Sequence, residues 1–62
     1  MFIVTLTNEG NKFWLRGTTW GFTADRANCF LSKEDAEKAI TKAKKFMTPA
    51  MYRKINIEEV TQ

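Results

Sequence analysis

The chain contains no histidine and a single cysteine, so several kinds of chemical site lack the residues they need. Cys29 cannot form an intramolecular disulfide, and without histidine the usual zinc-ligand spacings are absent. Histidine is also the commonest acid–base group near neutral pH. We therefore expect no disulfide, no metal site, no cofactor and no catalytic residue, and we predict that the chain is not an enzyme.

The remaining reactive side chains have structural explanations. Glu34 and Asp35 lie at the start of a predicted helix, where carboxylates interact favourably with the helix dipole. Glu58 and Glu59 are neighbours on a predicted strand and so point to opposite faces. A thiol nucleophile needs a nearby base, so we expect Cys29 to be a small buried apolar residue.

Long apolar runs and low-complexity segments are also missing. Residues 1–6 lack the basic and apolar regions of a signal peptide, and nowhere do about 18 apolar residues run together. The formal net charge of +3 is too small to mark a dedicated nucleic-acid binder. We expect one compact domain over residues 1–62, cytoplasmic and without a membrane partner.

The first part of the chain has the pattern of a β-hairpin. Apolar and polar residues alternate in residues 2–7 and again in residues 12–16, and Asn8–Asn11 between them has turn composition. In the second strand Phe13 and Leu15 share the face that a one-sided sheet would bury. The opposite face carries Lys12, Trp14 and Arg16.

Glycines interrupt the stretch that follows the hairpin. A bulge or bend at Gly17 would allow Trp20 and Phe22 to point inward, although both share sequence parity with Trp14. We favour this interpretation because so short a chain needs large rings in its core. Exposure of the two rings to a partner is the alternative.

The clearest local signal is a helix that begins after Ser32. Ser32 is an N-cap residue with Asp35 three positions later, and Thr48-Pro49 ends the helix. We expect one further turn over Pro49–Arg53 and a last strand over Lys54–Val60 beside the first strand. The residues expected to face the sheet are spaced by three and four: Ala36, Ala39, Ile40, Ala43, Phe46 and Met47.

These elements predict an α+β fold of order β-β-(β)-α-β. The sheet is small, with three or four mainly antiparallel strands, and one helix packs on one of its faces. The other face is then free to bind a partner. We predict a protein-binding surface made of Lys12, Trp14, Arg16, Met51 and Tyr52, since large aromatic and arginine side chains anchor protein interfaces.

Two alternatives to protein binding stay open. Trp14 between Lys12 and Arg16 could stack on single-stranded nucleic acid. In that case the helix lysines Lys38, Lys42 and Lys45 would contact phosphates. Alternatively, an exposed sheet edge or the uncovered face could form a homodimer.

Three segments resemble those of short bacteriophage and prophage proteins: Thr19–Thr23 (Thr-Trp-Gly-Phe-Thr), Ser32–Ala39 and Lys44–Met47. Such proteins pair an N-terminal hairpin with a Trp-Gly-aromatic-Thr stretch and a helix that opens with a similar cap. The resemblance implies a viral accessory protein that binds and inhibits or modulates a host protein, such as a defence or transcription factor, in the host cytoplasm. It implies no catalytic residues.

Overall fold

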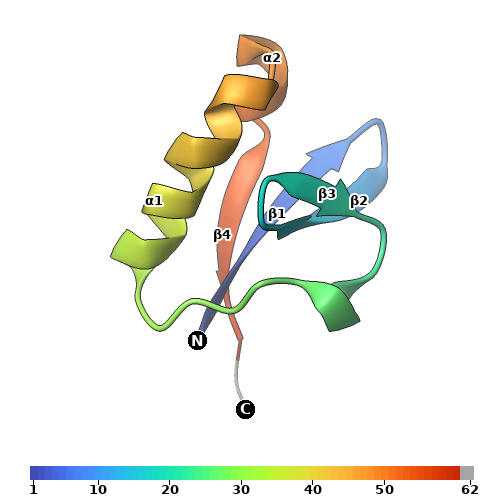
Figure 1. Cartoon of the computed structure of the whole chain (residues 1–62). Coiled ribbons are helices and arrows are strands. Elements are labelled where there is room, and N and C mark those ends of the chain that lie inside the picture. The colour runs from blue at the N-terminus through green and yellow to red at the C-terminus, as the bar shows by residue number, and fades with distance from the viewer. Residues whose placement is uncertain (61–62) are drawn as a thin grey trace.

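The computed structural model describes residues 1–60, which form a four-stranded antiparallel sheet with a helix on one face (Figure 1). The sheet order is β3-β2-β1-β4, and the main helix, α1 (Lys33–Ala43), lies between β3 and β4 in the chain. The α+β fold predicted from the sequence is confirmed. The strands are β1 (Phe2–Asn8), β2 (Asn11–Arg16), β3 (Thr19–Gly21) and β4 (Ile55–Glu59).

Two tight turns connect the first three strands. Between β1 and β2, Glu9 (φ 52°) and Gly10 (φ 81°) both have positive φ, as a type I′ turn requires. Between β2 and β3, Gly17 (φ 62°) is the first central residue, which is the arrangement of a type II′ turn. Gly17 therefore reverses the chain, and the prediction of a bulge there is wrong. The reversal sets Trp20 opposite Leu15 and thus on the helix-covered face.

Helix α1 begins where its capping residue predicts. The Ser32 hydroxyl accepts a hydrogen bond from the Asp35 backbone N–H at 3.2 Å. The helix then buries Ala36, Ile40 and Ala43 against the sheet.

The chain tightens into a 3₁₀ turn, η2 (Lys44–Phe46), directly after α1. A 3₁₀ turn has about 3.0 residues per turn instead of about 3.6, so it rotates the residues that follow off the α-helical stripe. Phe46 is consequently 73% exposed. The prediction that Phe46 faces the sheet is wrong for this reason.

A short second helix, α2 (Pro49–Tyr52), leads into β4. The Thr48 hydroxyl accepts from the Met51 N–H at 3.4 Å, and Pro49 occupies the first turn. This confirms the further helical turn expected after Thr48. It also directs the chain back to pair antiparallel with β1, from Phe2 opposite Glu59 to Leu6 opposite Ile55.

The core lies where α1 crosses the sheet. Val4 and Leu15 from the strands pack with the buried face of α1 (Ala36, Ile40 and Ala43). Figure 1 shows α1 alongside β4, with the turn between β1 and β2 on the side of the sheet that is far from the helix. The helix packs on Leu15 of β2 and lies near the turn between β2 and β3. The end of the same face at the turn between β1 and β2 lies farther from the helix.

An irregular connector joins β3 to α1 and contains one 3₁₀ turn, η1 (Ala24–Arg26). It ends beside β1, where Phe30 and Phe2 exchange backbone hydrogen bonds of 2.8 and 2.7 Å. Successive residues of an extended segment point in opposite directions, so Phe30 is half-buried and Cys29 is exposed. The expectation of a buried Cys29 is wrong. Across residues 1–60, no helix has the length and apolar character needed to cross a membrane.

Candidate functional site

The sheet face that α1 does not cover carries three of the five residues predicted to bind a partner. Thr5 lies directly opposite Trp14, and Trp14 opposite Gly21, so these residues share one face. Lys12 and Arg16 belong to the same face because they alternate with Trp14 along β2. We call this the outer face. Thr5 is only 1% exposed there, which shows that neighbouring side chains already cover it.

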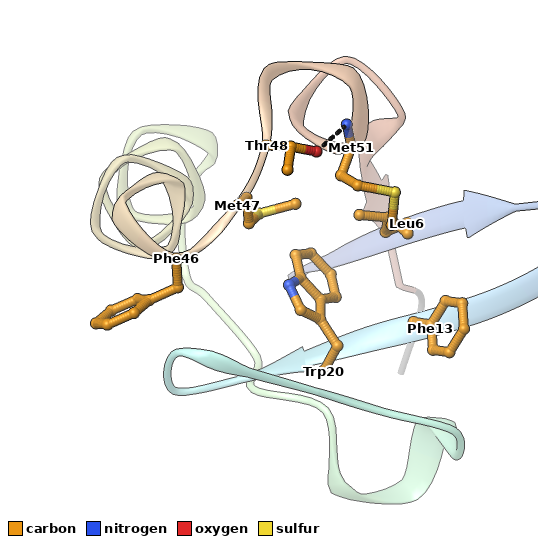
Figure 2. A pocket seen from close by; sticks show the side chains of 7 residues that line it. All are labelled: Leu6, Phe13, Trp20, Phe46, Met47, Thr48 and Met51. Carbon is orange, nitrogen blue, oxygen red and sulfur yellow. Dashed lines mark hydrogen bonds between the residues drawn. The ribbon is translucent and has the colours of Figure 1, made fainter.

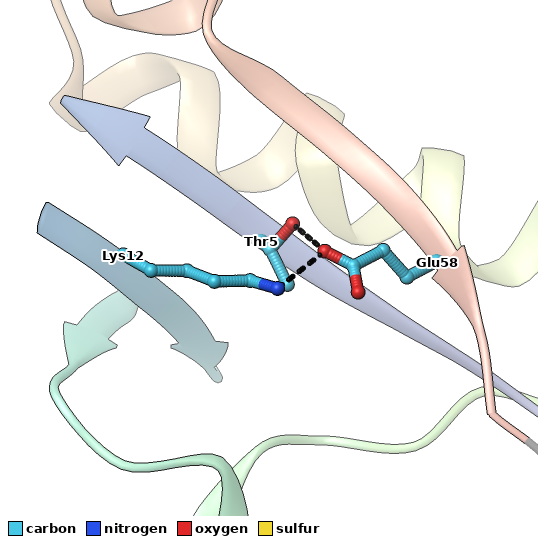
Figure 3. A network of polar contacts seen from close by, with 3 residues as sticks. All are labelled: Thr5, Lys12 and Glu58. Carbon is cyan, nitrogen blue, oxygen red and sulfur yellow. Dashed lines mark hydrogen bonds and ion pairs between the residues drawn. The ribbon is translucent and has the colours of Figure 1, made fainter. Parts of the chain in front are cut away.

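A polar network spans three strands on the outer face (Figure 3). The Lys12 Nζ lies 2.9 Å from the Glu58 Oε2, and the Thr5 hydroxyl donates to the same oxygen at 2.8 Å. The hydrogen bonds from Lys12 and from Thr5 hold the pKa of Glu58 below its ordinary value of 4.5. The charge of Lys12 is therefore balanced within the protein by a carboxylate of the same face.

The Trp14 ring is half-buried and has cationic neighbours. The Lys12 Nζ is 5.6 Å from its centroid, within the range of a cation–π contact. The aliphatic stem of Arg16 lies over Gly21, where its Cδ is 3.1 Å from the place that a Cβ would take. The three side chains thus pack against their own sheet.

The other two predicted binding residues lie on the helix side of the sheet. Tyr52 is half-buried against the core, with the Lys44 Nζ 4.9 Å from its ring centroid. Met51 lines a groove with Leu6 and Trp20. The structure therefore divides the predicted set between opposite faces and does not bring the five residues together.

The helix lysines form a separate group. Lys38 and Lys42 lie on α1 beside the half-buried Phe30, and Lys45 is on the 3₁₀ turn that follows. All three are exposed.

An apolar groove opens between the hairpin and the C-terminal end of α1. Its volume is about 270 Å³, and Figure 2 shows the side chains that surround it. One wall comes from the sheet, and the other comes from η2, α2 and the residues between them. The lining residues are Leu6, Phe13 and Trp20 on the first wall, with Phe46, Met47, Thr48 and Met51 on the second. We call this the apolar groove.

Aromatic rings continue the apolar groove onto the surface. Phe22 contacts Phe13 with ring centroids 5.1 Å apart, yet it remains 78% exposed. It follows directly after the end of β3. The prediction that Phe22 points into the core is wrong. The inward orientation predicted for Trp20 is confirmed, since Trp20 is half-buried and packs against the core.

Trp20 also carries an unpaired polar atom. Its indole Nε1 is buried, and residues 1–60 provide no hydrogen-bond acceptor for it. Figure 2 shows this nitrogen on the edge of the ring nearer to Phe46 than to Phe13. A buried donor without a partner costs about 1–3 kcal/mol. The buried Nε1–H of Trp20 is therefore left without an acceptor in the described part of the chain.

Charge is distributed unevenly around the molecule. Residues 38–57 contain no Asp or Glu, and this segment supplies the second wall of the apolar groove. Glu9, in the turn after β1, is the acidic residue closest in sequence to the other wall. The basic residues of the segment are Lys38, Lys42, Lys44, Lys45, Arg53 and Lys54.

Sequence reasoning singled out only Met51 among the residues of the apolar groove. Trp20, Phe46 and Met47 were all assigned to the core because their spacing fits a buried stripe or an inward ring. The signal that could have found the groove is the surplus of large apolar residues near the end of α1, where a narrow stripe cannot bury them all. Among residues 1–60 there is no cluster of three or more His, Cys, Asp or Glu side chains that could hold a metal ion.

Comparison with known proteins finds no relative that would assign a role to either surface. No protein-family model matches the chain, and no curated protein or solved structure is significantly similar to it. The functional proposal therefore depends on the geometry of this chain.

Proposed function

We propose that this chain is a non-enzymatic binding protein that docks a partner protein in the apolar groove. The observation that carries this proposal is a concave apolar surface in a chain of only 62 residues, with Phe46 exposed on its wall. Small proteins rarely leave large aromatic groups together in solvent unless another surface covers them. Aromatic and methionine side chains are enriched at the centres of protein interfaces.

The apolar groove suits this role better than the outer face does. On the outer face, Lys12 and Glu58 already satisfy each other, and the carboxylate would repel the phosphates of a nucleic acid. Trp14 is half-buried beside Lys12, so its ring offers less area for stacking. The groove residues have no such internal polar partners apart from the Thr48 hydroxyl, which caps α2.

The resemblance to phage accessory proteins supplies a biological context for the proposal. Small phage accessory proteins often act by binding a host protein, and a groove with aromatic walls suits such a contact. In this context the partner is a host defence or transcription protein, and docking inhibits or modulates it.

Affinity capture with matched variants tests the proposed function. The immobilised wild-type protein, Phe46→Ser and Arg16→Ala are each incubated with a lysate of the natural host cell, with and without nuclease treatment. We expect wild type and Arg16→Ala to retain the same protein after nuclease treatment and Phe46→Ser to lose it. Phe46 and Arg16 are both exposed, so neither change should unfold the chain, and circular dichroism verifies this.

Two results would contradict the proposal. Loss of the captured protein with Arg16→Ala but not with Phe46→Ser would move the binding surface to the outer face. Loss of the protein from the wild-type resin after nuclease treatment would show that nucleic acid bridges the two.

A further inference from the structure

We propose that the occupant of the apolar groove is an acidic peptide segment of the partner that inserts a bulky apolar side chain between Trp20 and Phe46. This inference rests on the proposed function and specifies the chemistry of the bound segment. It follows from the shape of the groove, from the charge of its second wall and from the unpaired indole nitrogen.

The size and lining of the apolar groove fit an apolar anchor. A volume of about 270 Å³ lies just below the range of about 300–1,000 Å³ typical of small-molecule sites. Apart from the Thr48 hydroxyl and the indole N–H of Trp20, the side chains that line the groove are apolar. Met47 and Met51 are unbranched and adapt to different side-chain shapes. One or two large apolar side chains of a peptide match this space.

Charge complementarity determines what should flank the anchor. The second wall belongs to a segment whose charges are all basic, and Lys45 directly precedes Phe46 in that segment, while no charged side chain lines the groove itself. The Lys44 Nζ lies over the Tyr52 ring. Arg53 and Lys54 follow α2, and Lys54 donates to the Asn8 side chain at the hairpin end of β1. A bound segment with Asp or Glu beside its anchor would place opposite charges next to these side chains.

The indole nitrogen of Trp20 adds a requirement for an acceptor. The Nε1–H has no partner within the described chain, and it belongs to a residue that lines the groove. A peptide brings backbone carbonyl and carboxylate oxygens with its anchor, and either can accept this hydrogen bond. Because this nitrogen is buried, neighbouring side chains must shift for the acceptor to reach it.

The same features disfavour two other occupants. A second copy bound symmetrically through the groove would oppose two walls of the same positive sign, which costs affinity. Single-stranded nucleic acid would find few hydrogen-bonding groups for its base edges, since the only polar side chain that lines the groove besides Trp20 is Thr48. Both occupants are outcomes of the experiment below.

The test uses three synthetic peptides of equal length and the full chain with Trp14→Phe, which leaves Trp20 as the only indole. The first peptide is acidic with Phe and Leu anchors, the second is basic with the same anchors, and the third is acidic with serine in place of the anchors. An oligo(dT) single strand is the fourth probe. Binding is measured by the fluorescence of Trp20 and by the NMR signal of its indole N–H.

We expect the acidic anchored peptide to bind at least about tenfold more tightly than the basic one at low salt, with the difference shrinking as salt rises. The Trp20 indole signal should move downfield as the hydrogen bond forms. The peptide without anchors should not bind. Phe46→Ser should weaken binding of the acidic anchored peptide by about tenfold, because it removes a wall of the groove.

A charge-reversal pair tests the role of the basic wall. Lys45→Glu should lower the affinity for the acidic anchored peptide and raise the affinity for the basic one. Lys33→Glu makes the same change of charge at the other end of α1 and should change the affinity for both peptides much less. Equal effects of the two substitutions would show that net charge, and not the groove, controls affinity.

The remaining outcomes separate the two proposals. If no peptide binds but Phe46→Ser still abolishes capture of the host protein, the inferred acidic segment is wrong and the docking function stands. If Phe46→Ser leaves capture unchanged, the docking function itself is wrong. Preferential binding of oligo(dT) would show that the groove binds single-stranded nucleic acid and not an acidic peptide. Self-association that Phe46→Ser abolishes would show that a second copy of the chain occupies the groove.

Discussion

Glu9 is the one residue other than glycine that has a positive φ within residues 1–60, at 52°. It occupies the first central position of the type I′ turn between β1 and β2, where asparagine is strongly preferred. A residue with a long side chain in the left-handed region stores strain. We predict that Glu9→Asn stabilises the protein by about 0.5–1 kcal/mol, measured by urea unfolding.

Charge is the competing explanation for such a gain, because Glu9→Asn also removes a negative charge. Glu9→Gln makes the same change of charge without the turn preference of asparagine. We expect Glu9→Gln to leave the unfolding free energy nearly unchanged. Equal stabilisation by both substitutions would show that the turn conformation at Glu9 is not the cause.

At the scale of elements, Glu58 joins three strands through one oxygen, since it accepts from Thr5 on β1 and pairs with Lys12 on β2. The pKa of Glu58 is lowered by the hydrogen bonds from Lys12 and Thr5, so the folded state favours the carboxylate. The resulting stabilisation is present above the unfolded pKa and is lost as the pH falls through the folded pKa.

We predict that Glu58→Gln reduces the unfolding free energy at pH 7 by less than about 1 kcal/mol, because Lys12 and Glu58 are 43% and 42% exposed. The difference from wild type should begin to shrink as the pH falls below about 4.5 and vanish below the folded pKa. Glu59→Gln is the matched control on the opposite face. A deficit that persists at low pH would show that the charge of Glu58 is not responsible.

The elements themselves were largely predictable because their signals are local. The alternation in residues 2–7 predicts β1, and Ser32 with Asp35 predicts the start of α1 through a contact that spans three residues. The turn at Gly17 was misread because a bulge and a two-residue turn both use glycine at positive φ. Only the pairing of the flanking strands distinguishes them.

The exposure of the groove residues could not be predicted from local patterns. The periodicity of α1 continues through Phe46, but the change to a 3₁₀ turn after Ala43 depends on tertiary packing. The exposure of Phe22 likewise depends on tertiary packing, since its ring contacts Phe13 and yet stays mostly in solvent. Met51 is the one groove residue that the sequence placed in the predicted binding set, and whether any residue of that set binds a partner stays a prediction.

At the scale of the whole molecule, the chain divides its large apolar side chains between a core and the apolar groove. Leu15 has no exposed surface and packs with Val4 and α1, whereas Phe46 is mostly in solvent. Buried residues such as Leu15 should stabilise the fold, because buried apolar area provides most of the free energy of folding. An exposed groove residue such as Phe46 should contribute to binding and little to folding.

We predict that Leu15→Ala costs about 2–5 kcal/mol, which approaches the whole stability of so small a domain. Phe46→Ser should cost less than about 1 kcal/mol, because most of its ring is exposed in the folded state. Urea unfolding followed by circular dichroism measures both changes. A loss with Phe46→Ser as large as that with Leu15→Ala would mean that the ring closes over Trp20 in solution and that the groove is part of the core.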